Sequence, residues 1–155
     1  MTQEALMPLD DSRDLEVRRD PLDVLEEARK AAKALKDVID AKPKKVIFGG
    51  ETYLEFEDWQ TVGRFYGITP RILSTGYVRF GDVEGWEAKA EAYHVPTGRV
   101  VASAEAMCLN DEPNWSRKPL FQLRSMAQTR ACAKALRNVL AWVVVLAGYK
   151  PTPAE

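Results

Sequence analysis

The chain has 155 residues, of which 46% are hydrophobic, and its formal net charge is -1. That length suits one domain with a core of its own. The longest apolar run, Val139 to Ala147, is far shorter than the roughly 20 residues of a bilayer-spanning helix, and the chain does not begin like a signal segment. Two cysteines and one histidine exclude a disulfide framework and a zinc motif. We therefore expect a cytoplasmic protein with reduced thiols, no metal and no membrane contact.

Charge is segregated along the chain. The segment Pro113 to Ala154 contains seven basic residues and no acidic one, so the acidic excess lies upstream. Such asymmetry predicts one positively charged surface that meets an anionic partner.

The first predicted element is an amphipathic helix that follows a flexible acidic tail over residues 1–20. Asp20 is a suitable N-cap, and Pro21 is tolerated in a first helical turn. Apolar positions then recur at three- and four-residue spacing until Pro43, at Leu25, Ala28, Ala32, Leu35 and Ile39. We expect a single domain over residues 21–150 and a short tail over 151–155.

A hairpin and a short helix are predicted next. The strand-like runs Val46–Phe48 and Tyr53–Phe56 are joined by Gly49-Gly50, a pair that suits the positive φ angles of a tight turn. A helix from about Asp58 to Tyr66 should end at Gly67. Its apolar side would carry Trp59, Val62 and Phe65.

Three longer strands should form an antiparallel meander. Residues 71–80, 86–95 and 99–109 have strand character, and residues 81–85 and 96–98 are typical of hairpin turns. One face of the last two strands is mostly alanine, with Trp86, Ala88, Ala90, Ala92, Val100, Ala102, Ala104 and Ala106. A sheet normally turns larger residues toward its core, so this pattern predicts a bulky element packed unusually close.

That element should be a long helix from near Pro119 to Gly148, capped by Ser116 or a neighbour. The helix has an apolar stripe of Cys132, Leu136, Val139, Leu140 and Val143. A second stripe of small residues consists of Ala127, Ala131 and Ala135. A third, basic stripe consists of Arg130, Lys134 and Arg137. We expect the small stripe to lie on the alanine face. The sequence thus predicts an α+β fold, in which a short N-terminal hairpin and an antiparallel β-meander pack against a long C-terminal α-helix.

The basic stripe has two interpretations. A row of cations on a helix is usually a solvated face. The long helix offers no acid for pairing, however, whereas the first helix mixes charges, as in Glu26 with Lys30 and Lys36 with Asp40. The contrast favours a polyanionic partner, and a phosphate backbone is the commonest one. The candidate DNA-binding residues are Arg130, Lys134, Arg137, Arg124, Arg117 and Lys118.

The sequence contains no recognisable catalytic motif. His94 adjoins a predicted turn, and no Ser-His-Asp order, glycine-rich phosphate loop or paired-cysteine motif is present. Acids such as Glu112, in a polar link before the long helix, could pair for acid–base chemistry or hold magnesium, but solvation is the better explanation for them. We therefore predict no catalytic residue, no cofactor and no enzymatic activity. A hot-dog-like acyl-thioester enzyme stays open as an alternative, because that fold also wraps an antiparallel sheet around one long helix and an alanine-rich sheet does not rule out an acyl tunnel.

Two segments carry a resemblance to a known family. Leu123 to Asn138 is an alanine-rich helix in which an Ala-Leu-Arg run follows basic residues, and the strand Tyr53–Phe56 precedes Trp59 and then Phe65–Gly67. These segments and the order of elements over residues 44–148 resemble the single-strand annealing proteins of recombination, which include phage Erf, RecT/Redβ and the eukaryotic annealase of the Rad group. One departure is Glu57-Asp58, where the eukaryotic relative carries a basic residue.

The resemblance implies a phage or mobile-element protein that binds single-stranded DNA and anneals complementary strands in homologous recombination and DNA repair. It assigns the DNA backbone to a groove lined by Lys134 and Arg137, with Arg130 nearby. It also implies a homo-oligomer, as a ring or filament, and a single-stranded-DNA-binding protein or a nuclease as a further partner. Exposed edges of the meander and the apolar segment Trp142–Leu146 would support assembly. The alternative is a small scaffold module whose basic helix binds an acidic protein.

Overall fold

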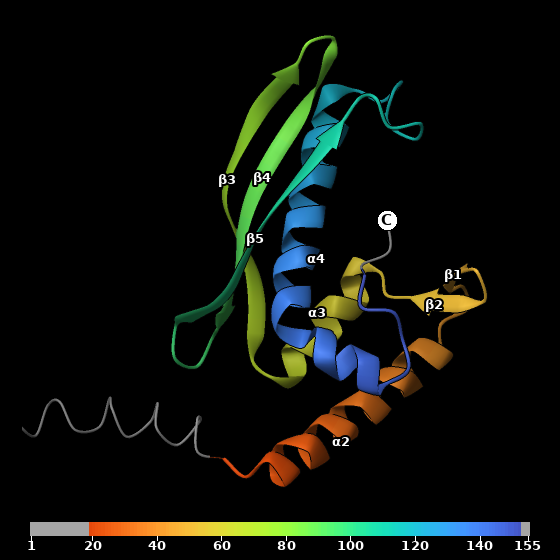
Figure 1. Cartoon of the computed structure of the whole chain (residues 1–155), viewed down its shortest axis with the longest axis vertical. Coiled ribbons are helices and arrows are strands. Elements are labelled where there is room, and N and C mark those ends of the chain that lie inside the picture. The colour runs from red at the N-terminus through yellow and green to blue at the C-terminus, as the bar shows by residue number, and fades with distance from the viewer. Residues whose placement is uncertain (1–18, 153–155) are drawn as a thin grey trace, which may run out of the picture.

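The computed structural model describes residues 19–152 and has the predicted α+β architecture (Figure 1). In chain order its elements are α2 (Pro21–Asp40), β1 (Val46–Phe48), β2 (Glu51–Tyr53), α3 (Phe56–Phe65), β3 (Ile68–Phe80), β4 (Val83–His94), β5 (Arg99–Leu109) and α4 (Leu120–Leu146). The predicted tails, residues 1–20 and 151–155, lie outside the described residues except for 19, 20, 151 and 152.

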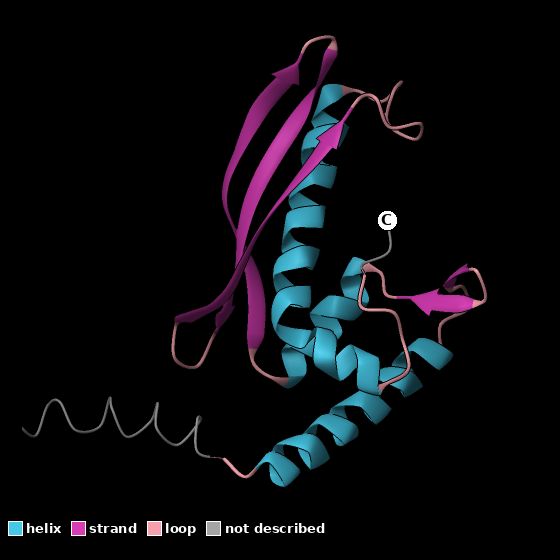
Figure 2. Cartoon of the chain, viewed as in Figure 1, coloured by secondary structure: helices cyan, strands magenta, loops and turns pink. Residues whose placement is uncertain are grey.

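The three long strands form an antiparallel meander in the order β3-β4-β5, and β1 and β2 form a separate hairpin (Figure 2). Gly49 and Gly50 have φ angles of 57° and 79°, which confirms the tight turn predicted after Val46–Phe48. The predicted second strand Tyr53–Phe56 is wrong, because β2 ends at Tyr53 and Phe56 begins α3. The turn between β3 and β4 is shorter than predicted, because only residues 81–82 lie between the strands instead of 81–85.

The pairing of β4 with β5 corrects one assignment made from the sequence. Ala92 pairs with Ala102, but the next pair joins Tyr93 to Val100, so Val101 is an extra residue in β5. This bulge breaks the alternation at the beginning of β5. Val100 is consequently 49% exposed and does not continue the alanine face.

The core is centred on two rows of alanine that face each other between β4 and α4. Ala88, Ala90 and Ala92 on the strand, and Ala127, Ala131 and Ala135 on the helix, are at most 1% exposed and belong to one cluster of buried residues. Since none of these side chains extends beyond Cβ, the helix can approach the sheet closely along its length (Figure 1). The predicted packing of the small stripe on the alanine face is confirmed.

The two shorter helices pack near the C-terminal half of α4 (Figure 1). Asp20 caps α2 as predicted, and its carboxylate accepts a 2.8 Å hydrogen bond from the Leu22 amide. On α3, Trp59 and Val62 are buried, but Phe65, which was expected on the same apolar side, is 43% exposed. Gly63 is the buried residue instead, and a Cβ there would lie 2.7 Å from the Ile68 carbonyl oxygen. The start of β3 therefore packs directly on the α3 backbone.

The long helix begins without the predicted serine cap. Pro119 occupies the N-cap position, while the Ser116 hydroxyl donates to the Pro113 carbonyl at 3.4 Å. Although α4 has 27 residues, neither it nor any other helix within residues 19–152 has an apolar stretch that could cross a bilayer.

The alanine packing predicts a specific sensitivity to side-chain size. Ala131→Leu should lower the free energy of unfolding by about 1–3 kcal/mol, because extra methylene groups would force the helix away from the sheet. Urea denaturation followed by circular dichroism measures the change. Ala34→Leu on the exposed side of α2 is the matched control, and it should alter stability by less than about 0.5 kcal/mol. Equal effects of the two substitutions would contradict the close contact.

Candidate nucleic-acid interface

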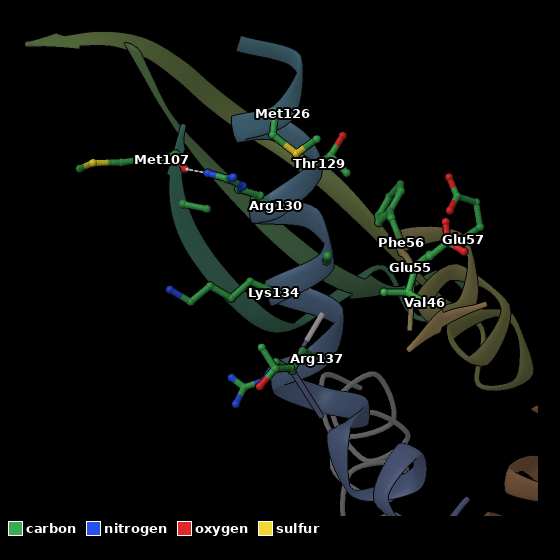
Figure 3. Close-up of a pocket in the computed structure, with 13 residues that line it drawn as sticks. Val46, Glu55, Phe56, Glu57, Met107, Met126, Thr129, Arg130, Lys134 and Arg137 are labelled. Carbon is green, nitrogen blue, oxygen red and sulfur yellow. Dashed lines mark hydrogen bonds between the residues drawn. The ribbon is translucent and has the colours of Figure 1, made fainter. Parts of the chain in front are cut away.

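A trough of about 590 Å³ runs beside α4, between β5 and the beginning of α3 (Figure 3). Met126, Thr129 and Ala133 of α4 line its floor. Arg130, Lys134 and Arg137 form a cationic wall, and Phe56 and Glu57 form the opposite wall at α3. The structure therefore gathers the whole basic stripe along one side of a single depression.

Side chains of α4 reach over the edge of β5 and bind its backbone carbonyl groups. Arg130 donates to the Met107 carbonyl at 2.8 Å, and Lys134 donates to the Glu105 carbonyl at 3.1 Å. Asn138 donates to the Ser103 carbonyl at 2.9 Å. Four residues of helix advance about 6 Å and two residues of strand about 6.7 Å, so donors and carbonyls keep nearly the same spacing. The middle of the β5 edge is thus covered by the helix.

Arg130 is a partly buried anchor of the fold. Its guanidinium makes a bidentate ion pair with Glu112, with N–O distances of 2.7 and 3.0 Å, and its side chain is only 12% exposed. The pair holds the pKa of Glu112 below its ordinary value of 4.5. The helix carries no acid, as predicted, but the loop before it supplies one. The interpretation of Glu112 as merely solvated was wrong, and the charge of Arg130 is neutralised.

Lys134 and Arg137 are held in position, and most of their donors have no partner among the described residues. The Lys134 ammonium uses one of its three donors on the Glu105 carbonyl, and Arg137 uses its Nε on the Pro151 carbonyl at 2.9 Å. Within residues 19–152 neither side chain forms an ion pair with a carboxylate. These two cations are the groups of the trough best placed to bind an anion.

The other three candidate residues lie elsewhere. Arg124 is near the beginning of α4, and its guanidinium carbon is 5.6 Å from the centre of the Trp86 ring, within cation–π range. Arg117 and Lys118 are in the exposed loop before α4. None of the three lines the trough. The six candidate DNA-binding residues therefore fall into two groups.

A partly buried ionic cluster fixes the α3 wall. The Lys42 ammonium contacts Glu55 at 2.8 Å and Asp58 at 3.0 Å, and Asp58, which is 4% exposed, also accepts from the Glu55 amide. Burial lowers the pKa of Lys42, but hydrogen bonds to both carboxylates outweigh it and the net shift is upward. The cluster secures the first turn of α3. Glu57 stays exposed there and has no cationic partner among the described residues.

Reasoning from the sequence missed three parts of this site: Glu112, Phe56 and Met126. Glu112 and Arg130 are 18 residues apart and on different elements, so no local pattern relates them. Phe56 and Met126 also come from separate elements. The spacing of Glu55 and Asp58, in contrast, is that of a capping box and could have indicated where α3 begins.

Neither Cys132 nor His94 lines the trough. Burial raises the pKa of the Cys132 thiol to about 11, so it stays protonated at neutral pH and is a poor nucleophile. His94 Nδ1 lies 2.9 Å from the Thr97 hydroxyl in a surface turn. Within residues 19–152 no three His, Cys, Asp or Glu side chains gather as metal ligands would.

Comparisons with protein-family models, with curated proteins and with solved structures find no match to this chain. What the protein binds has therefore to be inferred from the trough and the elements around it.

The Arg130 pair should be measurable in the stability of the protein. Arg130→Met should lower the free energy of unfolding at pH 7 by about 2 kcal/mol, because it leaves Glu112 without its charged partner. The pair lowers the folded-state pKa of Glu112, so its contribution is present above pH 4.5 and is lost as the pH falls through the lowered pKa. Denaturation from pH 7 to pH 3 measures this, and the difference in unfolding free energy between the two proteins should shrink toward the acidic end, where only the part due to the Met107 carbonyl remains. Arg117→Met, in the exposed loop, is the control and should have little effect. A constant difference across the range would contradict the assignment.

Proposed function

We propose that this protein binds single-stranded DNA in the trough and promotes annealing of complementary strands, without enzymatic turnover. The observation that carries the proposal is the state of Lys134 and Arg137: each is fixed by a backbone carbonyl, keeps free donors and has no carboxylate partner within residues 19–152. Such cations suit phosphates, because binding costs little further side-chain freedom and releases counterions from the nucleic acid.

The surroundings of α4 favour a single strand over a duplex. The meander covers one side of α4, and α2 and α3 contact the helix as well (Figure 1). A helix enclosed in this way cannot enter a major groove as a recognition helix does. A single strand can follow the trough instead. The observed order of elements is also the order on which the resemblance to annealing proteins rests.

We further propose that the protein works as an assembly of several copies, in a ring or a filament. The outer edge of β3 has no partner strand among the described residues. Trp142, Val145 and Leu146 are 43%, 53% and 43% exposed, which supports the predicted apolar surface near the end of α4. Large exposed apolar side chains in a cluster are typical of contact surfaces.

Two other functions make different demands on the structure. An acidic protein partner would bind the same cations, Lys134 and Arg137, and its attraction to the trough would come from charge alone. An acyl-thioester enzyme would need a tunnel between sheet and helix, where the alanine rows instead pack against each other. The geometry therefore gives more support to nucleic-acid binding.

Binding to single-stranded DNA should be independent of sequence and steeply dependent on salt. Lys134→Ala combined with Arg137→Ala should weaken it most at low salt and reduce the slope of log K against log salt by about 1.4, which is about 0.7 per lost phosphate contact. Titration of labelled oligonucleotides at several salt concentrations gives both quantities. The fold should survive, since alanine is favourable within a helix.

Arg29→Ala on the exposed side of α2 is the control and should leave binding unchanged. If the wild-type protein fails to bind at low salt, the annealing proposal is lost and an acidic protein partner becomes the better hypothesis. If Arg29→Ala weakens binding more than the double substitution does, the interface lies elsewhere.

Assembly beyond a dimer is expected at micromolar concentration. Trp142→Ser should shift the mass distribution toward smaller species, because it removes the largest exposed apolar side chain at the end of α4. Light scattering with and without DNA measures the mass. Phe121→Ser, equally apolar and 66% exposed at the other end of α4, is the control. A wild-type monomer under both conditions would rule out the ring or filament.

A further inference from the structure

The trough is more apolar than the binding of phosphates alone requires. Phe56, Val46, Met126 and Ala133 contribute apolar surface to its lining, beside the cations. Its volume of about 590 Å³ lies within the range of pockets that enclose organic ligands. A surface that bound only the DNA backbone would need neither the depth nor the aromatic ring. The apolar lining calls for an apolar part of the ligand.

The charges on the two walls orient such a ligand. Lys134 and Arg137 stand on the wall beside β5, whereas Glu57 stands across the floor at the beginning of α3 (Figure 3). A phosphate is attracted to the first wall and repelled by the second. The strand must then run its backbone along the cationic wall and turn its bases toward α3.

We infer that a nucleobase of the bound strand enters the trough and stacks on Phe56, with the Met126 thioether beside it. This inference rests on the proposed function and adds to it how the strand lies. Every base has a π-face, so stacking on an aromatic ring tolerates any sequence. Methionine sulfur also makes favourable contacts with aromatic rings. The bound strand is therefore held at two places, its phosphates and one of its bases.

The wild-type protein tests the inference with two oligonucleotides of equal length. One is oligo-dT, and the other carries abasic residues in place of thymidine, so the phosphates are the same and the bases are missing. The abasic strand should bind at least about fivefold more weakly, the lower limit for stacking of a base on an aromatic side chain. Fluorescence titration at one fixed salt concentration measures both affinities.

Matched variants then locate the contact. Phe56→Leu keeps an apolar side chain but removes the ring, so it should weaken binding of oligo-dT about fivefold and leave the abasic strand unchanged. Phe48→Leu is the control, because Phe48 is 76% exposed on β1 and does not line the trough. Lys134→Ala with Arg137→Ala should weaken binding of both strands by the same factor.

The outcomes distinguish failure of base insertion from failure of the proposed DNA binding itself. Equal affinity of the wild-type protein for the two strands overturns base insertion and leaves phosphate binding standing. A base-dependent affinity that Phe56→Leu does not change places the base outside the trough and also overturns the inference. Binding to neither strand at low salt removes the proposed function itself. Should Phe56→Leu fail to fold, as judged by circular dichroism, Met126→Ala takes its place, because Met126 also lines the trough. It should weaken binding of oligo-dT and leave the abasic strand unchanged, and an equal effect on both strands would overturn the inference.

Discussion

Close contact between the alanine rows of β4 and α4 determines where the rest of the molecule can lie. Side chains that end at Cβ let the helix axis approach the sheet, and all six alanines are almost completely buried there. Larger residues would fill the core equally well but would lift the helix away. The fold therefore depends on the smallness of these residues as much as on their apolar character.

The same closeness produces the candidate interface. Because α4 lies near the sheet, Arg130 and Lys134 are long enough to reach the β5 carbonyls, and Arg137 meets the C-terminal segment at Pro151. Each contact orients a cation before any ligand arrives. Arg130 is then neutralised by Glu112, so the stripe that looks uniform in sequence has one structural member and two that remain available.

Local sequence patterns predicted the helices and strands well, whereas most contacts between these elements could not be predicted from the sequence. Periodicity located the two long helices and the meander, and the alanine face correctly indicated what packs on it. The pairing of Arg130 with Glu112 depends on how a loop returns to the helix, and the bulge at Val101 depends on the register of two strands. Neither is encoded within a short window. The packing of Gly63 on the start of β3 is again a contact between elements, and the sequence of α3 alone did not reveal that Phe65 would be exposed.

The coverage of β5 by α4 restricts the symmetry of any assembly that grows by strand pairing. With the middle of the β5 edge covered, the outer edge of β3 is the long edge that the sheet leaves open within the described residues. An edge that pairs with its own copy makes a two-fold contact, and such a contact closes after two subunits. A ring or filament needs a second, head-to-tail contact between unlike surfaces. Strand pairing alone would therefore make this protein a symmetric pair, with both troughs related by the same two-fold axis.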